Sequence, residues 1–295
     1  MADIITPGMV ASICPARPED GHKGTFGTAL IIAGSRYMTG AQTLSVMAAL
    51  RSGCGMVRVY APDDSLESTR VNCPCALLSA WGDTETSTIR RFSEYLAGAA
   101  SVGIGPGLDE SDRRSAALLE QTICNAPRLV IDAGALNIIA RQRDRFLPLI
   151  ASRVSDSNLE PAVLTPHVGE FRRLTGCDDI TPDEYEEKCV QFALQNKCVT
   201  VLKTHKTIVS DVNGKCYINN IGNNGMAKGG CGDVLTGLIT GLCAQKIPSF
   251  DSAVAGVYLH ALSGDLAASD IGRRVMIPED LPGFFDEAFA SAGWD

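Results

Sequence analysis

The 295-residue sequence lacks the cysteine spacings that bind metals or cross-link small secreted folds. It has 11 cysteines, but none forms a Cys-x-x-Cys pair, and Cys73-Pro-Cys75 is the only close spacing. This pattern excludes a common type of zinc site and a small disulfide scaffold. We therefore expect reduced thiols, as in a cytoplasmic protein.

Long hydrophobic runs and excess basic charge are also missing. The first residues, MADIITPGMVASICP, carry an acidic side chain and no long apolar run, so we expect neither a signal peptide nor a membrane span. A formal net charge of -8 argues against a nucleic-acid surface. Local backbone amides can still bind a small anion in an acidic protein. We expect a cytoplasmic protein with small-molecule ligands and neither nucleic acid nor membrane as a partner.

Two familiar nucleotide signatures are absent as well. The first glycine-rich segment is HKGTFGTALIIAGSRYMTGA (22–41), which contains neither G-x-G-x-x-G nor a Walker G-K-S/T element. A Rossmann dinucleotide site and a P-loop are therefore not supported.

Short apolar runs alternate with longer helical patterns along the chain. Continuous apolar runs fit strands that are buried on both faces of a parallel sheet. They lie at residues 28–34, 56–62, 76–80, 101–105, 128–134, 162–166 and 199–204. Helical segments lie between them, and the chain from Met226 onward looks helical. The alternation predicts a doubly wound α/β fold.

The segment TIVSDVNGKCYIN (207–219) differs, because Asn213-Gly214 lies between two β-prone runs and indicates a tight hairpin. We expect this hairpin to be antiparallel, at the edge of a mostly parallel sheet. Thr181 with Glu184 reads as a capping box before a helix. No linker, repeat or low-complexity tract interrupts the chain, so we expect one domain over residues 1–295.

A glycine-dense loop passes directly into an apolar segment in NNGMAKGGCGDVLTGLITGL (223–242). Gly229, Gly230 and Gly232 clear side chains from a helix start, where backbone amides and the helix dipole favour phosphate. A carboxylate at this position would repel phosphate. The presence of Asp233 is explained if its side chain removes a proton beside a phosphate that is being transferred. The alternative is that Asp233 only caps the helix.

Polar residues follow two other predicted strands. LKTHKTIV (202–209) clusters Lys203, His205 and Lys206, either against a nucleotide or as a solvated basic loop. LTPHVGEF (164–171) places His167 and Glu170 past a strand; the histidine is a candidate substrate contact, and Glu170 a candidate to act through water on Mg²⁺.

Two further strand ends carry weaker signals. In VIDAGALN (130–137), Asp132 and Asn137 either face a ligand or satisfy turn amides. The glycines of GIGPGL (103–108) fit a plain turn as well as a ligand contact.

Taken together and in this order, the motifs resemble the ADP/ATP-dependent NAD(P)H-hydrate dehydratases, a branch of the ribokinase-like superfamily. The similar segments run from HKGTFGTALIIAGSRYMTGA through AALRSGCGMVRVYAP, GIGPGL, VIDAGALN and LTPHVGEF to NNGMAKGGCGDVLTG. The resemblance implies a ribokinase-like three-layer sandwich without a separate lid domain. It also implies a lyase that repairs hydrated NADH or NADPH while hydrolysing ADP or ATP, with Mg²⁺ bridging the nucleotide phosphates.

The resemblance also implies roles for individual residues. Asp233 would be the catalytic base, and the hydrate would contact Ala41, Gly105, His167 and Asp233. The nucleotide would lie against Cys231, Gly232 and the loop formed by Lys203, Thr204, His205, Lys206 and Thr207. No direct metal ligand is implied. Relatives often form tetramers and many are fused to an epimerase, so we expect a homo-oligomer and a separate epimerase protein.

Three positions depart from the family pattern. Thr204 replaces the usual glycine of the nucleotide loop, and non-glycine residues avoid positive φ. Cys231 replaces a usual serine, which preserves an amide role but not a hydroxyl role. Gly134 stands where many relatives carry a second aspartate.

Two other functions stay open. A vitamin-precursor kinase of the same superfamily would use the G-x-G-D loop equally well and would form a stable phosphorylated product. A non-catalytic nucleotide-binding protein would not need Asp233.

Overall fold

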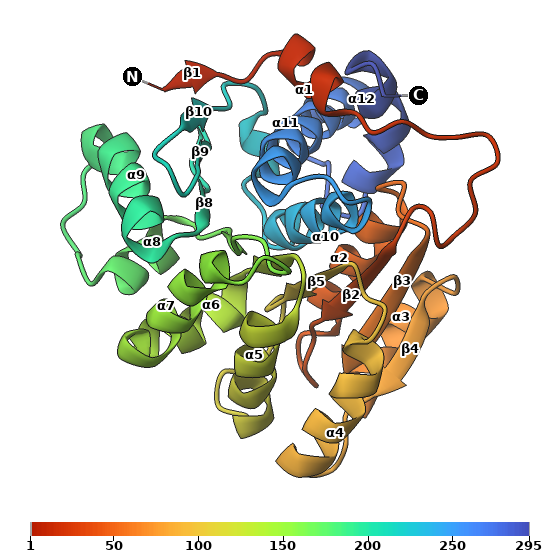
Figure 1. Ribbon diagram of the computed structural model, residues 1–295. Helices are drawn as coiled ribbons and strands as arrows, with labels where there is room; N and C mark the ends of the chain where they lie inside the picture. Colours follow the sequence, from red (N-terminus) through yellow and green to blue (C-terminus); the bar gives the residue numbers. More distant parts are fainter. Residues whose placement is uncertain (1, 295) are drawn as a thin grey trace.

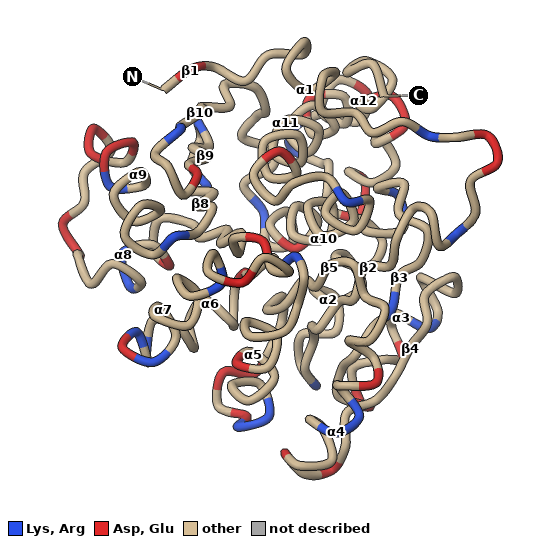
Figure 2. Tube along the Cα trace, viewed as in Figure 1, with Lys and Arg blue, Asp and Glu red and all other residues tan. Residues whose placement is uncertain are grey.

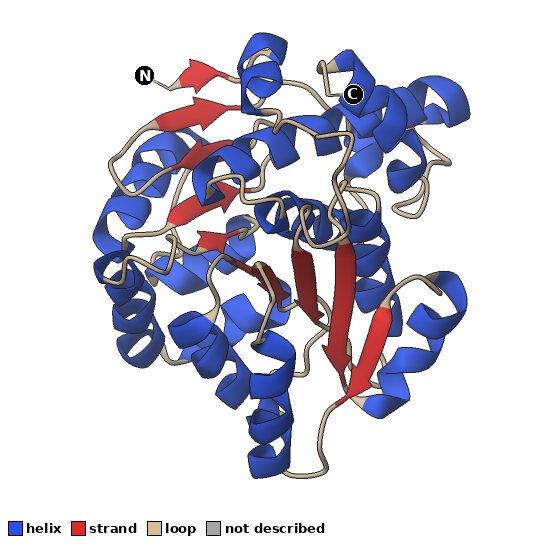
Figure 3. Ribbon diagram, turned by 45° about the vertical axis from the view of Figure 1, so that its right-hand side comes forward, coloured by secondary structure: helices blue, strands red, loops and turns tan. Residues whose placement is uncertain are grey.

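The structure is a computed structural model that describes residues 2–294. It has three layers: one ten-stranded sheet in the middle and helices on each of its two faces (Figure 1). The strand order is β1-β10-β9-β8-β7-β6-β5-β2-β3-β4. Figures 1 and 3 show helices packed on both sides of this sheet. The ribbon runs outward from β2 to β4 and then returns to β5 on the other side of β2. This reversal is the switch point at which α/β folds bind ligands.

All seven strands predicted from apolar runs are present, each shorter than its run, and they pair in parallel. Their bounds are β2 Thr28–Ile32, β3 Met56–Ala61, β4 Leu77–Ala80, β5 Ser101–Ile104, β6 Leu129–Ile131, β7 Val163–Leu164 and β8 Val199–Leu202. The carboxyl ends of these strands therefore meet at one edge of the sheet.

The predicted hairpin is confirmed as β9 (Ile208–Ser210) and β10 (Cys216–Ile218), which pair antiparallel. Gly214 adopts a φ of 85° in its turn, as the Asn-Gly signal requires. Strand β9 also pairs antiparallel with β8. Outside β10 lies the two-residue strand β1 (Asp3–Ile4), which pairs in parallel and which the apolar pattern did not predict.

Helices cover both faces because alternate residues of each strand point to opposite sides. On one face, α10 (Cys231–Ala244) lies against β2, β5 and β6, between α2 (Thr39–Leu50) and α11 (Ser249–Ala267). Gly237 permits this close approach, because a Cβ there would lie 2.0 Å from the Ser45 carbonyl oxygen of α2. Smaller helices complete this side: α1 Pro7–Ile13, α3 Leu66–Asn72 and α12 Phe285–Ser291.

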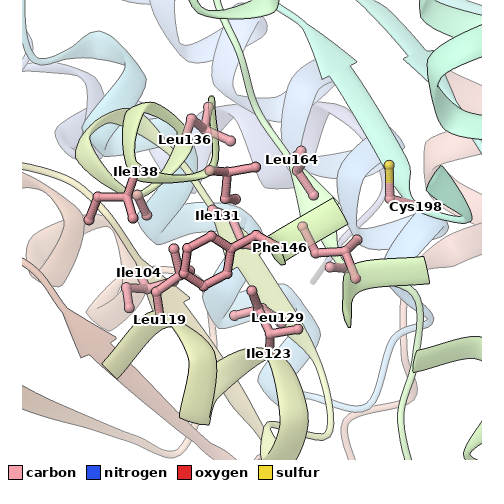
Figure 4. Close-up of a cluster of buried hydrophobic side chains, with 14 of the residues drawn as sticks. Ile104, Leu119, Ile123, Leu129, Ile131, Leu136, Ile138, Phe146, Leu164 and Cys198 are labelled. Carbon is pink, nitrogen blue, oxygen red and sulfur yellow. The ribbon is translucent and has the colours of Figure 1, made fainter. Parts of the chain in front are cut away.

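The other face carries the remaining helices: α4 Glu85–Leu96, α5 Arg113–Asn125, α6 Ala133–Arg141, α7 Arg143–Ser152, α8 Val168–Thr175 and α9 Tyr185–Asn196. They bury a core in which the Phe146 ring of α7 lies among aliphatic side chains of β5, β6 and α5 (Figure 4). The capping box of Thr181 and Glu184 is confirmed just before α9.

Charged residues (Figure 2) and cysteines are distributed over the whole molecule. Figure 2 shows acidic and basic residues interspersed along the described chain. Within residues 2–294 the eleven cysteines form no disulfide. In the same range, no helix is both long and apolar enough to cross a bilayer.

Candidate active site

Four strand ends and one helix start converge at the carboxyl edge of the sheet. Gly105 follows β5, Asp132 follows β6, His167 follows β7 and Lys203 follows β8. A parallel bridge joins His167 to Lys203, and the Lys203 amide donates to the Pro166 carbonyl. The N-terminus of α10, which carries Asp233, meets this group from the helix layer.

The glycine-dense loop starts α10 in a way that leaves amides free. Gly230 is the N-cap at a φ of 108°, in the left-handed region that favours glycine. Cys231 donates only a long bond to the Lys228 carbonyl, at 3.4 Å. Within residues 2–294 the amides of Gly232 and Asp233 have no hydrogen-bond acceptor. The loop therefore offers unpaired donors at a positive helix end, a setting that suits an anion.

Asp233 is the third residue of α10 and not its cap. In the described chain, its carboxylate accepts no hydrogen bond from the helix start, so the interpretation of Asp233 as a simple cap is wrong. The backbone around it is held by Ser45 of α2, whose hydroxyl donates to the Asp233 carbonyl at 2.9 Å. The side chain thus remains available for chemistry.

Lys203 is the cation at the centre of the site. Its Nζ donates to Asp132 Oδ1 at 2.7 Å, and the Thr236 hydroxyl donates to Asp132 Oδ2 at 2.7 Å. A Cβ on Gly232 would lie 3.2 Å from Nζ, so the ammonium sits directly beside the α10 start. Burial would lower the pKa of Lys203, but Asp132 and Glu170 outweigh it and raise the pKa. Lys203 therefore stays charged.

Asp233 has the perturbed pKa expected of a base. Burial, helped by the charge of Asp132, raises the pKa of its carboxyl to about 7, against the opposing effect of Lys203. A carboxyl with this pKa changes its charge near neutral pH, which is where a general base works best.

His167 and Glu170 form a capping box at the start of α8. The Gly169 and Glu170 amides donate to His167 Nδ1, and the His167 amide donates to Glu170 Oε2 at 2.8 Å. Since Nδ1 accepts two bonds, the proton of the neutral ring lies on Nε2. Burial, with Lys203 nearby, lowers the pKa of His167, so the ring is a neutral donor at pH 7. Half of its side chain is exposed.

The two remaining predicted substrate contacts, Gly105 and Ala41, lie in close-packed backbone, in the turn after β5 and in the first turn of α2. Gly105 has a φ of 129°, and a Cβ there would lie 1.8 Å from the Asp132 carbonyl oxygen. Ala41 of α2 lies against Gly107, where a Cβ would be 3.0 Å from that of Ala41. Gly105 therefore has a structural reason to be glycine, and the contact of Gly105 and Ala41 with substrate stays a prediction.

The predicted nucleotide loop divides into two parts. Lys203 turns inward to Asp132, whereas His205 and Lys206 are exposed to solvent. The Thr204 hydroxyl donates to the Lys206 carbonyl at 2.7 Å, and the Thr207 hydroxyl donates to the Thr204 carbonyl. Thr204 does not adopt positive φ, so its replacement of glycine introduces no backbone strain. The loop has its own hydrogen bonds, and nucleotide contact is untested.

Sequence reasoning did not assign roles to several residues that organise the site. The sequence places Asp132 only as a polar group at a strand end. It does not indicate that Asp132 accepts a hydrogen bond from Lys203. Thr236 and Ser45 were not singled out. Thr236 lies one turn after Gly232 on α10, and this helical spacing was the only available signal that it faces the same site.

No group of three or more His, Cys, Asp or Glu side chains in residues 2–294 is placed to hold a metal ion. Both oxygens of Glu170 face His167, and the carboxylate is buried. A water-mediated metal role for Glu170 would compete with these contacts, and it stays a prediction.

Comparison with known proteins gives a consistent result. Residues 29–283 match the family described as NAD(P)H-hydrate dehydratase. The chain is 31% identical to the ADP-dependent (S)-NAD(P)H-hydrate dehydratase of Bacillus subtilis, over 92% of both chains. It is 34% identical to a bifunctional NAD(P)H-hydrate repair enzyme of Moorella thermoacetica, over 95% of this chain. The chain spans about half the length of that relative, 52%.

A solved structure agrees over the whole fold. The Bacillus subtilis ADP/ATP-dependent NAD(P)H-hydrate dehydratase, co-crystallised with ATP and Mg²⁺, superimposes with a TM-score of 0.82 and 28% identity. The match covers 99% of both chains. This protein therefore belongs to the NAD(P)H-hydrate dehydratase family.

Proposed function

We propose that this protein dehydrates the S form of NAD(P)H hydrate to NAD(P)H while ADP or ATP is hydrolysed. The observation that carries the proposal is the Asp233 carboxyl, with a pKa of about 7, beside unpaired amides at the start of α10. Family membership supports the substrate class, and the names of relatives support the nucleotide.

In the proposed reaction, ionised Asp233 takes the proton from the C6 hydroxyl of the hydrate. The hydroxyl oxygen then attacks the terminal phosphorus of the nucleotide, and the bond to the leaving phosphate oxygen breaks. A hydroxyl leaves poorly, whereas the phosphorylated oxygen leaves readily. Elimination of phosphate, with loss of a ring proton, restores the dihydronicotinamide.

The chain's own groups would stabilise the negative charge that develops on the transferred phosphate. The Gly232 and Asp233 amides are fixed before reaction, and Lys203 holds a positive charge beside them. Such preorganised donors lower the barrier without reorganisation during the step. Mg²⁺ held by the nucleotide phosphates would neutralise part of their charge, and water would complete its coordination. The amides and the Lys203 ammonium would contact the phosphate oxygens and not the metal, so the metal would arrive with the nucleotide.

The neutral His167 ring carries its proton on Nε2, which lies 3.4 Å from Glu170 Oε1 and would turn this proton to the hydrate in place of that carboxylate. Its tautomer is set by the two α8 amides, so the direction of this bond is defined before substrate binds. A homo-oligomer and a separate epimerase partner remain predictions by analogy.

The test is absorbance at 340 nm, with NADH hydrate, Mg²⁺ and either ADP or ATP. We expect absorbance to rise with at least one nucleotide and to stay flat without any.

Asp233→Asn should bind nucleotide normally and lose at least about a hundredfold in kcat, the usual scale of a general base. Asp183→Asn, at an exposed position just before α9, is the matched control.

A flat trace with both nucleotides would reject the dehydratase. Formation of a stable phosphorylated alcohol would then identify a small-molecule kinase of the same superfamily. Turnover by Asp233→Asn equal to wild type would reject Asp233 as the base.

A further inference from the structure

An open hollow of about 520 Å³ lies between α6 and α8, beside the site and outside it. Arg141, Arg172 and Arg173 line it, together with Glu110 and Asp178. Three arginines and two carboxylates give the lining a formal charge of +1, in a protein whose net charge is -8. Arginine forks match phosphate geometry.

The hollow lies close to two segments that are expected to contact substrate, the start of α8 with His167 and the turn after β5 with Gly105. Arg173 Nη1 lies 3.7 Å from the position of a Cβ on Gly169, whose amide bonds to His167. Glu110 lies two residues beyond the Gly105–Leu108 turn. Helices α6 and α8 lie side by side (Figure 1).

Arg172 and Arg173 are held by neutral oxygens, Arg172 through its Nη2 bond to the Ile180 carbonyl, and neither is neutralised by a carboxylate in the described chain. Arg173 donates through Nε and Nη2 to the neutral Asn137 amide oxygen, at 3.1 and 2.9 Å. Glu110, which accepts from Asn137 Nδ2, is paired with Arg141 at 2.6 Å. No carboxylate in the described chain pairs with Arg172 or Arg173, and Arg172 Nε is buried without an acceptor.

The substrate contacts assigned by resemblance account only for the reacting end of a dinucleotide. Ala41, Gly105, His167 and Asp233 would contact the ring to be dehydrated, and the phosphates and adenosine would then extend beyond them. We propose that the arginine hollow binds a phosphate group of the dinucleotide hydrate, through Arg173 with Arg141 and Arg172. This inference rests on the proposed function and adds a binding subsite to it.

The test compares Arg173→Gln with wild type on the hydrates of NADH and NADPH. Loss of one charge-assisted contact should raise KM for the hydrate about tenfold, with kcat and the KM for ADP or ATP unchanged. A rise with both hydrates places the pyrophosphate in the hollow. A rise confined to NADPH hydrate places the 2′-phosphate there. Arg173→Lys should recover part of the loss, because it keeps the charge without the fork.

Arg145→Gln is the matched control, since Arg145 lies on α7 and pairs with Glu120 outside the hollow. Arg141→Gln provides a second variant if Arg173→Gln fails to fold, with the same KM shift expected. Quenching or enhancement of NADPH fluorescence on binding gives a Kd that does not depend on turnover.

The two proposals fail differently. If wild type turns over neither hydrate, the proposed function fails. If wild type turns over both, and folded Arg173→Gln and Arg141→Gln keep wild-type KM and Kd, the subsite is rejected.

Discussion

Opposing electrostatic effects on the Asp233 carboxyl set its pKa, and the pKa sets the pH range in which the carboxyl can accept a proton. Burial and the Asp132 carboxylate favour the protonated form, while Lys203 favours the ionised form, and the pKa settles at about 7. A base must be ionised to accept a proton. Activity therefore depends on pH in the physiological range, with the carboxyl losing its function as pH falls.

We expect kcat/KM for the hydrate to fall on the acid side with an apparent pKa near 7. Asp132→Asn removes a negative charge that raises the pKa of Asp233, so its acid limb should shift to lower pH. A pH–rate profile from pH 5 to 9 measures both. Substitution of exposed Asp183 by Asn serves as the control and should leave the limb unchanged. If the acid limb of the pH–rate profile lay at the same pH in Asp132→Asn as in wild type, the Asp132 charge would not be a cause of the raised pKa of Asp233.

At the scale of elements, the contact between α10 and α2 holds the start of α10, which carries Asp233, in place. Gly237 allows the Ser45 backbone to approach, and Ser45 donates to the backbone of Asp233. Packing and catalytic positioning thus depend on the same pair of helices.

Gly237→Ala should destabilise the fold by about 1–3 kcal/mol, because the new Cβ would overlap the Ser45 carbonyl and force the helices apart. Urea unfolding followed by circular dichroism measures this loss. Gly8→Ala in α1 is the control, since its Cβ would meet nothing within 4 Å. Equal midpoints for both variants would show that the helices separate at no cost.

The strands were the most predictable elements, because burial on both faces leaves continuous apolar runs that read directly in the sequence. Their order was not predictable, since nothing local in β5 indicates that it pairs with β2. Strand β1 has two residues and no apolar pattern. The hairpin was predictable because Asn213-Gly214 encodes its turn locally.

The site divides in the same way. Asp233 is identifiable from the sequence, because a carboxylate in a loop suited to binding phosphate is explained only by a chemical role. The bond from Lys203 to Asp132 joins residues 71 positions apart, so only the folded chain brings them together. The sequence indicates His167 as a substrate contact and Glu170 as a residue that acts on Mg²⁺ through water, but their shared capping box depends on where α8 begins.

At the scale of the whole molecule, the active site reduces global stability. The pKa of Asp233 rises from 3.8 to about 7 on folding, so the folded state binds this proton more tightly than the unfolded state does. The free energy of unfolding consequently falls as pH rises from about 4 to 7, and the cost is complete above 7.

Asp233→Asn should therefore be more stable than wild type by about 1–3 kcal/mol at pH 8, with the difference shrinking toward zero near pH 4. Chemical denaturation at pH 4, 6 and 8 checks the trend. Asp183→Asn, at an exposed position, should track wild type throughout. A constant difference across pH would mean that Asn stabilises by something other than charge.

Cys231 begins α10, where a thiol is usually made acidic by the helix end. It is 7% exposed, and burial raises its pKa instead. The side chain therefore stays in its unreactive protonated form, and electrophiles meet the exposed Cys75, Cys124 and Cys177 first. The surface can thus carry a fluorophore or a spin label on native thiols while the catalytic loop remains chemically untouched.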